Sequence, residues 1–298
     1  MDAHCQKIFN EYVAKKPIYE KLCEVVTSNL KKSLSNGRLI AGIEARLKTE
    51  NSLKGKLELK GMKYSSLSDI TDILGARVIT FYTDDIEPVA AVIETIFDVD
   101  WENSVDKRKI HESNSFGYMS LHYICRLPER IFKDENYPEI NDIRFEIQMR
   151  TALQHVWATI EHDMGYKTDV EIPIEYSRAL SRLAGLLEIA DEEFRTVREK
   201  IFDYRRKVLK LVKSGNFDDV SFSVDSFKNY LEVEPFKPIT ESIASALHTE
   251  VQPAGLLPYY SVFKTLGVKT LGDIEKIKKE CTDDAVRLVV YQIGDKDI

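Results

Sequence analysis

The sequence predicts an α/β (α+β) fold, in which helices pack on a mixed β-sheet and a helical extension follows. A strand-like, β-branched segment at residues 74–82 leads into helical spacing at residues 84–97. Two more strand-like segments, residues 119–127 and 143–150, then follow close together. A strand–helix pair followed by adjacent strands is typical of a mixed sheet. The helical extension is predicted from a long charge-rich stretch at residues 175–213.

The composition is that of a folded globular protein. Of the 298 residues, 43% are hydrophobic and 10% aromatic, which excludes a disordered chain and suggests about two domains. No apolar run approaches the roughly 20 residues that span a bilayer, and the N-terminus is not that of a signal peptide. The four cysteines form no C-x-x-C pair, so we expect a cytoplasmic protein without a disulfide framework. A net charge of −7 argues against a protein that coats nucleic acid, although it allows a local basic pocket.

The N-terminal region, residues 1–37, is predicted to be helical. Apolar residues recur there at steps of three and four, and Pro17 is expected to divide the stretch. Residues 38–48 and 52–60 are predicted as two further helical segments. They begin a core domain that we assign to residues 38–172.

The residues after the core domain are predicted to be mainly helical. A long helix is assigned to residues 173–214, where alternating charges accompany an apolar stripe. The Gly215-Asn216 pair breaks this helix. A small helical domain is then expected at residues 215–298, and its residues 267–274 have the pattern of a tight turn that caps a helix.

Basic and hydroxyl side chains cluster at residues 46–60. Arg46 and Lys48 lie two residues apart, while Ser52, Lys56 and Lys60 follow at steps of four, on one face of a predicted helix. Lysine supplies compact positive charge, and arginine can fork onto phosphate or stack on a base. The cluster can therefore hold a polyphosphate, with a solvated helix face as the alternative explanation.

Asp72, Gly75 and Arg77 stand at the entrance to the first predicted strand. A carboxylate just before a buried strand can lie at the edge of the sheet, where Mg²⁺ would bind. Gly75 allows close approach of the backbone, and Arg77 would point into the same site. The alternative is a helix-to-strand turn with a surface ion pair.

A small polar loop precedes the second predicted strand. Lys109 belongs to a basic segment before this loop, Tyr118 ends it, and His122 follows in the strand. Tyrosine is a stacking platform for a nucleobase, and neighbouring basic residues can reach its phosphates. The alternative is a surface loop whose aromatic residues pack on the core.

Glu146, Gln148 and Arg150 share one face of the third predicted strand, because side chains alternate along a strand. Three polar side chains on one face of an otherwise apolar strand are not expected in a hydrophobic core. They suit a site where Glu146 joins the carboxylate before the first strand around a metal ion. In the following helix, His155 and His162 lack a cysteine partner, so we interpret them as structural histidines rather than zinc ligands.

The order of these clusters resembles the synthetase domain of the RelA/SpoT alarmone synthetases. The succession R-x-K…S-x-x-x-K, D-x-x-G-x-R, D-x-x-K…G-Y-x-S-x-H and E-x-Q-x-R-T…W…E-H…Y-K runs from Arg46 to Lys167. The resemblance implies a mixed five-stranded sheet flanked by helices, similar to that of nucleotidyltransferases. It also implies a GTP pyrophosphokinase, which uses Mg²⁺ to move the β,γ-diphosphate of ATP to the 3′-hydroxyl of GDP or GTP. The product would be a guanosine tetra- or pentaphosphate alarmone.

Carried over by motif, the resemblance implies a role for each candidate residue. Side chains that bind ATP would be Arg46, Lys48, Ser52, Lys56 and Arg77, with the arginines around the adenine and the lysines on the phosphates. Side chains that bind the acceptor would be Lys109, Tyr118, His122, Gln148 and Arg150. The catalytic residues and Mg²⁺ ligands would be Asp72 and Glu146, and Glu146 would also activate the 3′-hydroxyl.

Several departures from the family leave the acceptor open. The short region upstream and the limited length downstream lead us to expect a small, single-activity synthetase. Residues 111–114 read His-Glu-Ser-Asn where the family usually has a Pro-Lys element, which weakens the case for an acceptor held by a 5′-diphosphate. Some small relatives are toxins that pyrophosphorylate the 3′ end of tRNA, so tRNA is an alternative acceptor. A catalytically silent module is the second alternative, and the C-terminal domain could serve a homo-oligomer or an antitoxin partner.

Overall fold

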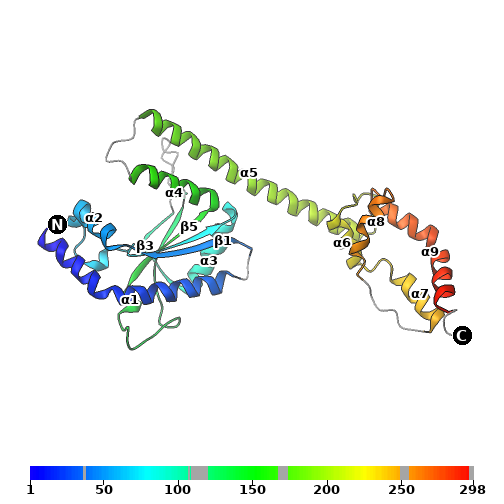
Figure 1. Cartoon of the computed structure of the whole chain (residues 1–298), viewed down its shortest axis with the longest axis horizontal. Helices are drawn as coiled ribbons and strands as arrows, with labels where there is room; N and C mark the ends of the chain where they lie inside the picture. Colours follow the sequence, from blue (N-terminus) through cyan, green and yellow to red (C-terminus); the bar gives the residue numbers. More distant parts are fainter. Residues whose placement is uncertain (36–37, 107, 109–119, 167–173, 249–254, 295–298) are drawn as a thin grey trace. The chain divides into compact units, whose positions relative to one another are not determined.

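The computed structural model divides the chain into two compact units, Met1–Thr196 and Val197–Ile298 (Figure 1). It describes residues 1–35, 38–106, 108, 120–166, 174–248 and 255–294. The first unit contains a five-stranded sheet with helices packed on it, and the second unit is helical. No helix in these described ranges is both long enough and apolar enough to cross a membrane.

The sheet has the strand order β1-β2-β5-β4-β3. Its strands are β1 (Ile40–Leu47), β2 (Leu74–Thr80), β3 (Asp98–Asp106), β4 (Leu121–Arg126) and β5 (Arg144–Thr151). The central pair, β2 and β5, is parallel, and the other neighbouring strands are antiparallel. The predicted mixed sheet is therefore confirmed, and its parallel pair lies at the centre.

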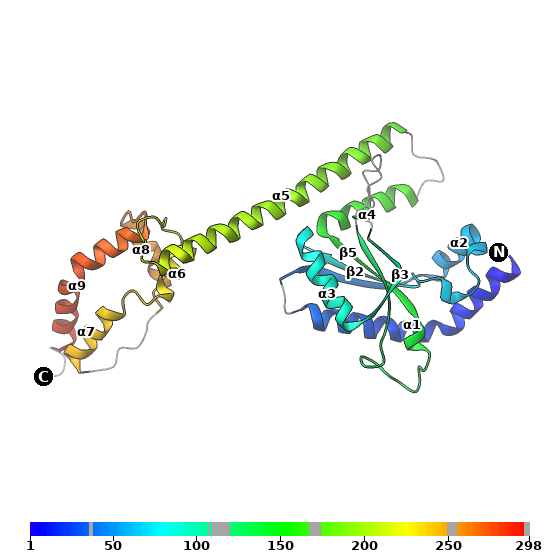
Figure 2. The same ribbon diagram turned by 180° about the vertical axis from the view of Figure 1, so that it is seen from behind.

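Helices cover both faces of the sheet (Figures 1 and 2). On one face, α1 (Ala3–Leu34) and α3 (Ile86–Ile96) share a hydrophobic core with the inward side chains of β2, β4 and β5. On the other face, α4 (Ala152–Tyr166) follows β5 and contacts β2 and β5. A smaller core forms where α2 (Glu50–Lys60) packs against the N-terminal half of α1. Burial of each large side chain in these cores stabilises the fold by roughly 1.5 to 3 kcal/mol.

The helix predicted for residues 38–48 is wrong, because most of this segment forms β1. Ile43, Ala45 and Leu47 alternate with polar residues and pack against the sheet core. The period of this pattern is two, which is the period of a strand. Pairing with β2 then supplies the backbone hydrogen bonds that fix the segment as a strand.

The expected break at Pro17 is also wrong, since α1 runs without interruption from Ala3 to Leu34. A proline removes one helical hydrogen bond and costs about 3 kcal/mol. Tyr12 lies before Pro17, and Tyr19 and Leu22 lie after it, all buried on the same side of the helix. Their packing offsets the cost of the proline.

Strand β3 was not predicted from the residues themselves. Its sequence is rich in aspartate and asparagine, which are depleted in strands, and it forms the exposed edge of the sheet. Only pairing with β4 makes it a strand, and the register is irregular between Asp100 and Val105.

Helix α5 (Ile174–Lys213) begins in the first unit and continues into the second. In the first unit, the buried Thr151 hydroxyl at the end of β5 donates a hydrogen bond of 2.6 Å to Asp191 of α5. Burial raises the pKa of this carboxyl, and the hydrogen bond from Thr151 partly opposes the shift. The contact fixes α5 to the end of the central strand.

The second unit contains α6 (Val224–Glu232), α7 (Lys237–Leu247), α8 (Tyr260–Thr265) and α9 (Leu271–Gly294). Its core is rich in aromatic side chains, among them Phe227 and Tyr230. The predicted turn before the last helix is confirmed. Gly267 adopts a positive φ of 82°, and the Asp273 carboxylate accepts backbone hydrogen bonds at the start of α9.

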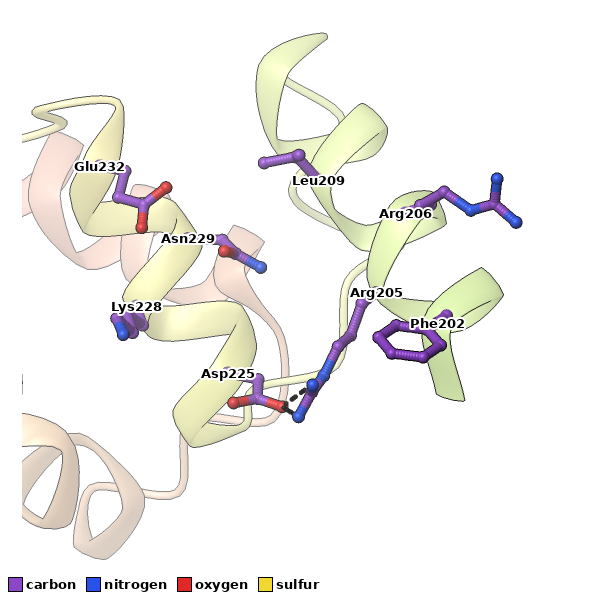
Figure 3. A pocket seen from close by; sticks show the side chains of 8 residues that line it. All are labelled: Phe202, Arg205, Arg206, Leu209, Asp225, Lys228, Asn229 and Glu232. Carbon is purple, nitrogen blue, oxygen red and sulfur yellow. Dashed lines mark hydrogen bonds and ion pairs between the residues drawn. The ribbon is translucent and has the colours of Figure 1, made fainter. Parts of the chain in front are cut away.

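A cavity of about 450 Å³ lies between α5 and α6 within the second unit (Figure 3). It is lined by Phe202, Arg205, Arg206, Leu209, Asp225, Lys228, Asn229 and Glu232. Its charges are mixed, and Arg205 pairs with Asp225 at 3.0 Å. None of the residues predicted to bind nucleotides belongs to it.

Shortening a core side chain of α1 should destabilise the first unit. Leu22 is fully buried, so Leu22→Ala should lower the free energy of unfolding by about 2 to 5 kcal/mol. The measurement is urea unfolding followed by tryptophan fluorescence, because Trp101 and Trp157 both lie in the first unit. Leu59→Ala is the control, since Leu59 is 84% exposed and its loss should change little. Equal effects of the two variants would contradict the packing described for α1.

Candidate active site

The sheet face opposite α1 and α3 carries most of the predicted site residues. The register between β2 and β5 sets Glu146 beside Gly75 and Gln148 beside Arg77. On β4, His122 lies opposite Gln148. Because side chains on paired positions point to the same face, these polar groups form one surface across three strands. The predicted common face of the polar residues on β5 is confirmed.

A cluster of two lysines and one carboxylate lies at the start of β2. The Nζ atoms of Lys48 and Lys56 are each 2.7 Å from an oxygen of Asp72. The backbone N–H of Lys48 donates to the Ile73 carbonyl at 2.8 Å, which holds Lys48 beside β2. Burial is the largest single influence and would raise the pKa of Asp72, but the hydrogen bonds and the charges of Lys48 and Lys56 together outweigh it, and the pKa is lowered. Asp72 is therefore an ionised carboxylate between two ammonium groups.

Glu146 is held by a second set of hydrogen bonds. Its Oε1 lies 2.7 Å from Nδ1 of His122, and Nε2 of the same ring lies 2.6 Å from the buried hydroxyl of Ser120. Since a carboxylate cannot donate, Nδ1 carries the proton toward Glu146, and in a neutral ring Nε2 then accepts from Ser120. Burial is the largest single influence and would raise the pKa of Glu146, yet the hydrogen bond and charge of His122 together with the hydrogen bond from Gln148 outweigh it, and the pKa is lowered. The arrangement fixes both the ring and the carboxylate.

The same chain of hydrogen bonds continues along β5. Gln148 Nε2 donates to the other oxygen of Glu146 at 2.8 Å. Arg150, which is 2% exposed, donates to Gln148 Oε1 at 2.7 Å. Each of these side chains on β5 is oriented by its neighbour. The amide of Gln148 has only one suitable orientation, because its NH₂ group must face the carboxylate of Glu146 and its oxygen the guanidinium of Arg150.

Asp72 and Glu146 lie close enough to influence one another. The charge of Asp72 is among the causes that raise the pKa of Glu146, against the larger lowering by His122. Gly75 of β2 follows Asp72 by three residues and is paired with Glu146 of β5. It has no side chain, and a Cβ built there would meet no atom within 4 Å. The two carboxylates thus flank open space over the sheet. Oxygen ligands of this kind suit Mg²⁺, which needs one or two carboxylates when phosphates and waters complete its shell.

No group of three or more His, Cys, Asp or Glu side chains suited to a metal occurs among the residues that the structure describes. A metal ion bound at this site would therefore depend on the substrate for some of its ligands. The two carboxylates present fit Mg²⁺ if phosphate oxygens of the substrate and waters supply the remaining ligands.

Arg46 and Arg77 lie on neighbouring strands of the same face. Arg46 is opposite Gly75, and Arg77 is opposite Glu44, so the two arginines are diagonal neighbours. Arg77 also makes an ion pair of 3.4 Å with Glu44. His155 of α4, interpreted above as structural, approaches the same carboxylate at 3.5 Å. Burial lowers the pKa of His155, so α4 presents this ring to the site face in a form that is mostly neutral.

The remaining predicted residues are placed differently. Ser52 is exposed near the start of α2, where Thr49 caps its backbone N–H at 3.2 Å, and it lies one turn before Lys56 on the same helix face. Lys60 is exposed at the last turn of that helix. Lys109 and Tyr118 lie outside the described residues. The structure therefore brings Lys48, Lys56 and Asp72 together in one cluster. A second cluster is the series of hydrogen-bonded side chains His122, Glu146, Gln148 and Arg150.

Two residues near this face were absent from the predicted site. Ser120 belonged to the motif before β4 but had no role, although its spacing of two from His122 puts both side chains on one strand face. Glu44 lies two residues before Arg46, and the same alternation would have identified it once the segment was recognised as a strand.

The chain is similar in sequence to a region of RelA and SpoT proteins and to two GTP pyrophosphokinases. Residues 45–171 match the model described as "Region found in RelA / SpoT proteins". GTP pyrophosphokinase YjbM of Bacillus subtilis is 29% identical over 160 residues, which cover 53% of this chain and 72% of that protein. GTP pyrophosphokinase YwaC of the same organism is 27% identical over 161 residues, covering 53% of this chain and 73% of YwaC.

Solved structures show the same fold. The small alarmone synthetase 1 from Bacillus subtilis, bound to its product pppGpp, superimposes with a TM-score of 0.56 at 24% identity, covering 64% of this chain and 98% of that one. The small alarmone synthetase 2 from the same organism gives 0.52 at 26% identity, with 64% and 97% covered. The sheet and its flanking helices are thus shared with these proteins.

Replacing Asp72 should destabilise the first unit in a pH-dependent way. Because its folded pKa lies below the ordinary 3.8, Asp72 adds stability above that pH, and this stability is lost as the pH falls through the folded pKa. Asp72→Asn should therefore cost about 1 to 2 kcal/mol at pH near 7 and progressively less below pH about 4.

The measurement is the urea midpoint at each pH, followed by tryptophan fluorescence. Glu102→Gln serves as the control, since Glu102 is exposed on the edge strand β3. If the difference in urea midpoint between the wild type and Asp72→Asn were the same near pH 7 and below pH about 4, the ion-pair cluster of Asp72 with the two lysines would be contradicted.

Proposed function

We propose that this chain, in which residues 45–171 form a RelA/SpoT-type region, is an ATP-dependent diphosphotransferase of the GTP pyrophosphokinase kind. It would move the β,γ-diphosphate of ATP to the 3′-hydroxyl of GDP or GTP. The observation that carries the proposal is one sheet face with a lysine–aspartate cluster beside an oriented glutamate. Two similar proteins, YjbM and YwaC, bear the name GTP pyrophosphokinase.

The basic groups suit the polyphosphate of ATP. Lys48 and Lys56 lie together at Asp72, where a triphosphate would exchange their present carboxylate partner for phosphate oxygens. Diagonal positions on neighbouring strands lie roughly 7 to 8 Å apart, which leaves room for a flat purine between the guanidinium groups of Arg46 and Arg77. Ser52 on α2 completes the side chains proposed to bind ATP.

Mg²⁺ is proposed as the cofactor, held by Asp72 and Glu146. Bound there, the ion would neutralise charge on the transferred diphosphate. Asp72 has both of its oxygens on lysines, so release of those lysines to the phosphates would free the carboxylate for a metal. The exchange keeps every charged group paired.

Glu146 is proposed to accept the proton of the attacking hydroxyl. The 3′-oxygen forms a bond to the β-phosphorus of ATP, the bond between that phosphorus and the α,β-bridging oxygen breaks, and AMP leaves. The lowered pKa of Glu146 keeps the carboxylate charged near neutral pH, which orients the hydroxyl by a hydrogen bond. Diphosphate transfer needs positioning and charge neutralisation more than covalent help, and this face supplies both.

His122, Gln148 and Arg150 are proposed to lie on the acceptor side. Lys109 and Tyr118 would join them by motif, the tyrosine as a platform for the base. The small alarmone synthetase 1 from Bacillus subtilis binds pppGpp, a guanosine product. We therefore take a guanosine nucleotide as the acceptor.

The test is transfer of label from γ-labelled ATP to GDP, GTP or deacylated tRNA. We expect label in guanosine tetra- or pentaphosphate and none in tRNA. Label in tRNA alone would contradict the guanosine acceptor, and no transfer while ATP still binds would contradict the enzymatic proposal. In the same assay, Glu146→Gln should reduce the rate about 10²- to 10⁴-fold, because the proton acceptor and one metal ligand are lost.

The matched control for Glu146→Gln is Glu102→Gln, the same change at an exposed position of β3. It should keep wild-type activity. Retained activity in Glu146→Gln, with the urea midpoint of the wild type, would contradict the assignment of Glu146.

His122 is proposed to position Glu146, and its replacement should change the pH profile of the reaction. His122→Asn should lower kcat roughly 10- to 100-fold with a small effect on the KM for ATP. The bond from His122 lowers the pKa of Glu146, so its loss should raise that pKa and move the acidic limb of the kcat profile to higher pH. His4→Asn, at an exposed histidine of α1, is the control. An unmoved acidic limb would show that His122 acts only on the fold.

A further inference from the structure

The turn between β1 and α2 is held by two hydrogen bonds to the backbone of Lys48. This residue follows Leu47, the last residue of β1, and precedes Thr49, the N-cap of α2. Its carbonyl accepts a hydrogen bond of 2.7 Å from the hydroxyl of Tyr12 on α1, and its N–H donates to the carbonyl of Ile73 at 2.8 Å. Together these bonds fix the backbone of Lys48 between α1 and the segment that leads into β2.

Tyr12 is a rigid anchor for this contact. It is 1% exposed and lies in the core that α1 forms with Leu53 and Leu57 of α2. Its ring packs against that of Tyr19, with 5.9 Å between the two centroids. Burial raises the pKa of the Tyr12 hydroxyl, so the group keeps its proton near neutral pH and can donate it. Phenylalanine would fill the same space, so the hydroxyl is the part of this side chain that acts on Lys48.

A second contact from α1 reaches the same turn but contributes less. Lys16 lies one helical turn after Tyr12, and its Nζ is 2.8 Å from Oε1 of Glu50, the first residue of α2. The two side chains are 41% and 45% exposed, and ion pairs this exposed add little to stability. The hydrogen bond from the buried Tyr12 is the stronger constraint, because its loss leaves a carbonyl unsatisfied beside the core.

The backbone contacts of Lys48 would matter most when ATP is bound. In the structure, the Nζ of Lys48 is also held by Asp72, at 2.7 Å. Under the proposed function this ammonium leaves Asp72 for the phosphates, so the ion pair no longer helps to place the lysine. A lysine side chain is a flexible four-carbon stem, and it meets a ligand reliably only if its backbone is held in place. The bonds to Tyr12 and Ile73 do not involve the ammonium and would persist during this exchange.

We propose that Tyr12 is a positioning residue for ATP, and that its hydroxyl holds the backbone of Lys48 so that the lysine meets the polyphosphate. Tyr12 would act through Lys48 and would touch neither ATP nor the acceptor. The inference rests on the proposed function, because it takes Lys48 as a ligand of the phosphates. It gives α1, which packs on the sheet face opposite the site, a part in binding ATP.

The test is the Tyr12→Phe variant of the full chain, which removes only the hydroxyl. Its KM for ATP should rise roughly 3- to 10-fold, the factor that one hydrogen bond contributes to an equilibrium. Its kcat and its KM for GDP should stay within about twofold of the wild type, because only the binding of ATP is weakened. A merely structural role would reduce the folded fraction, and so the apparent kcat, but it would leave the KM unchanged.

The Kd for ATP with Mg²⁺ is measured by calorimetry in the same proteins, without an acceptor. It should rise in Tyr12→Phe by the same factor as the KM. Because no acceptor is present, this measurement tests the inference even if the acceptor is not GDP.

The matched control is Tyr19→Phe, the same change on the same helix and in the same core. Tyr19 is 4% exposed, and its hydroxyl makes no hydrogen bond to any residue that the structure describes. This variant should keep the KM and the Kd of the wild type. The urea midpoint of both variants, followed by tryptophan fluorescence, checks that each is folded under the assay conditions.

A double-mutant cycle tests whether Tyr12 acts through Lys48. Lys48→Ala keeps the backbone carbonyl but lacks the ammonium, so adding Tyr12→Phe to it should change the Kd for ATP by less than about twofold. An undiminished effect of Tyr12→Phe in that background would overturn the inference. So would an unchanged KM and Kd in Tyr12→Phe alone, or an equal rise in Tyr19→Phe. A wild type that does not bind ATP would instead contradict the proposed function, and the inference with it.

Discussion

The parallel pairing of β2 with β5 is the constraint on which the candidate site depends. It places Glu146 beside Gly75 and Gln148 beside Arg77, while the apolar side chains between them enter the core with α1 and α3. A slip of one residue would exchange the two faces and bury the charged groups, at a cost of several kcal/mol for each unpaired charge. The hydrophobic core therefore fixes the register, and the register fixes the site.

The site is arranged so that its charges are paired before any ligand binds. Asp72 lies between two lysines, and Glu146 takes hydrogen bonds from His122 and Gln148. Unpaired, these half-buried groups would destabilise the fold, because desolvation disfavours their charged forms. Under the proposed function, they would exchange these partners for those of a triphosphate and a divalent metal. Folding and binding would then use the same groups.

Helix α5 follows a different principle from the sheet. In the first unit, the buried Thr151 hydroxyl donates a hydrogen bond to Asp191 of α5, while large apolar side chains of the helix such as Leu186 and Ile189 stay exposed. A helix this long gains little stability from its own hydrogen bonds in water and relies on packing of an apolar face.

The sequence alone determined the order of the motifs, most of the helices and the common face of Glu146, Gln148 and Arg150, because these follow from local periodicity. It also carried the resemblance that implied a five-stranded sheet. It misassigned residues 38–48 and missed β3, since a short strand is stabilised by its neighbour rather than by its own residues. Tertiary structure alone decided that Lys48 and Lys56 meet at Asp72 and that His122 reaches Glu146. Those contacts join residues far apart in the chain, and only the packing and pairing of the strands bring them within hydrogen-bonding distance.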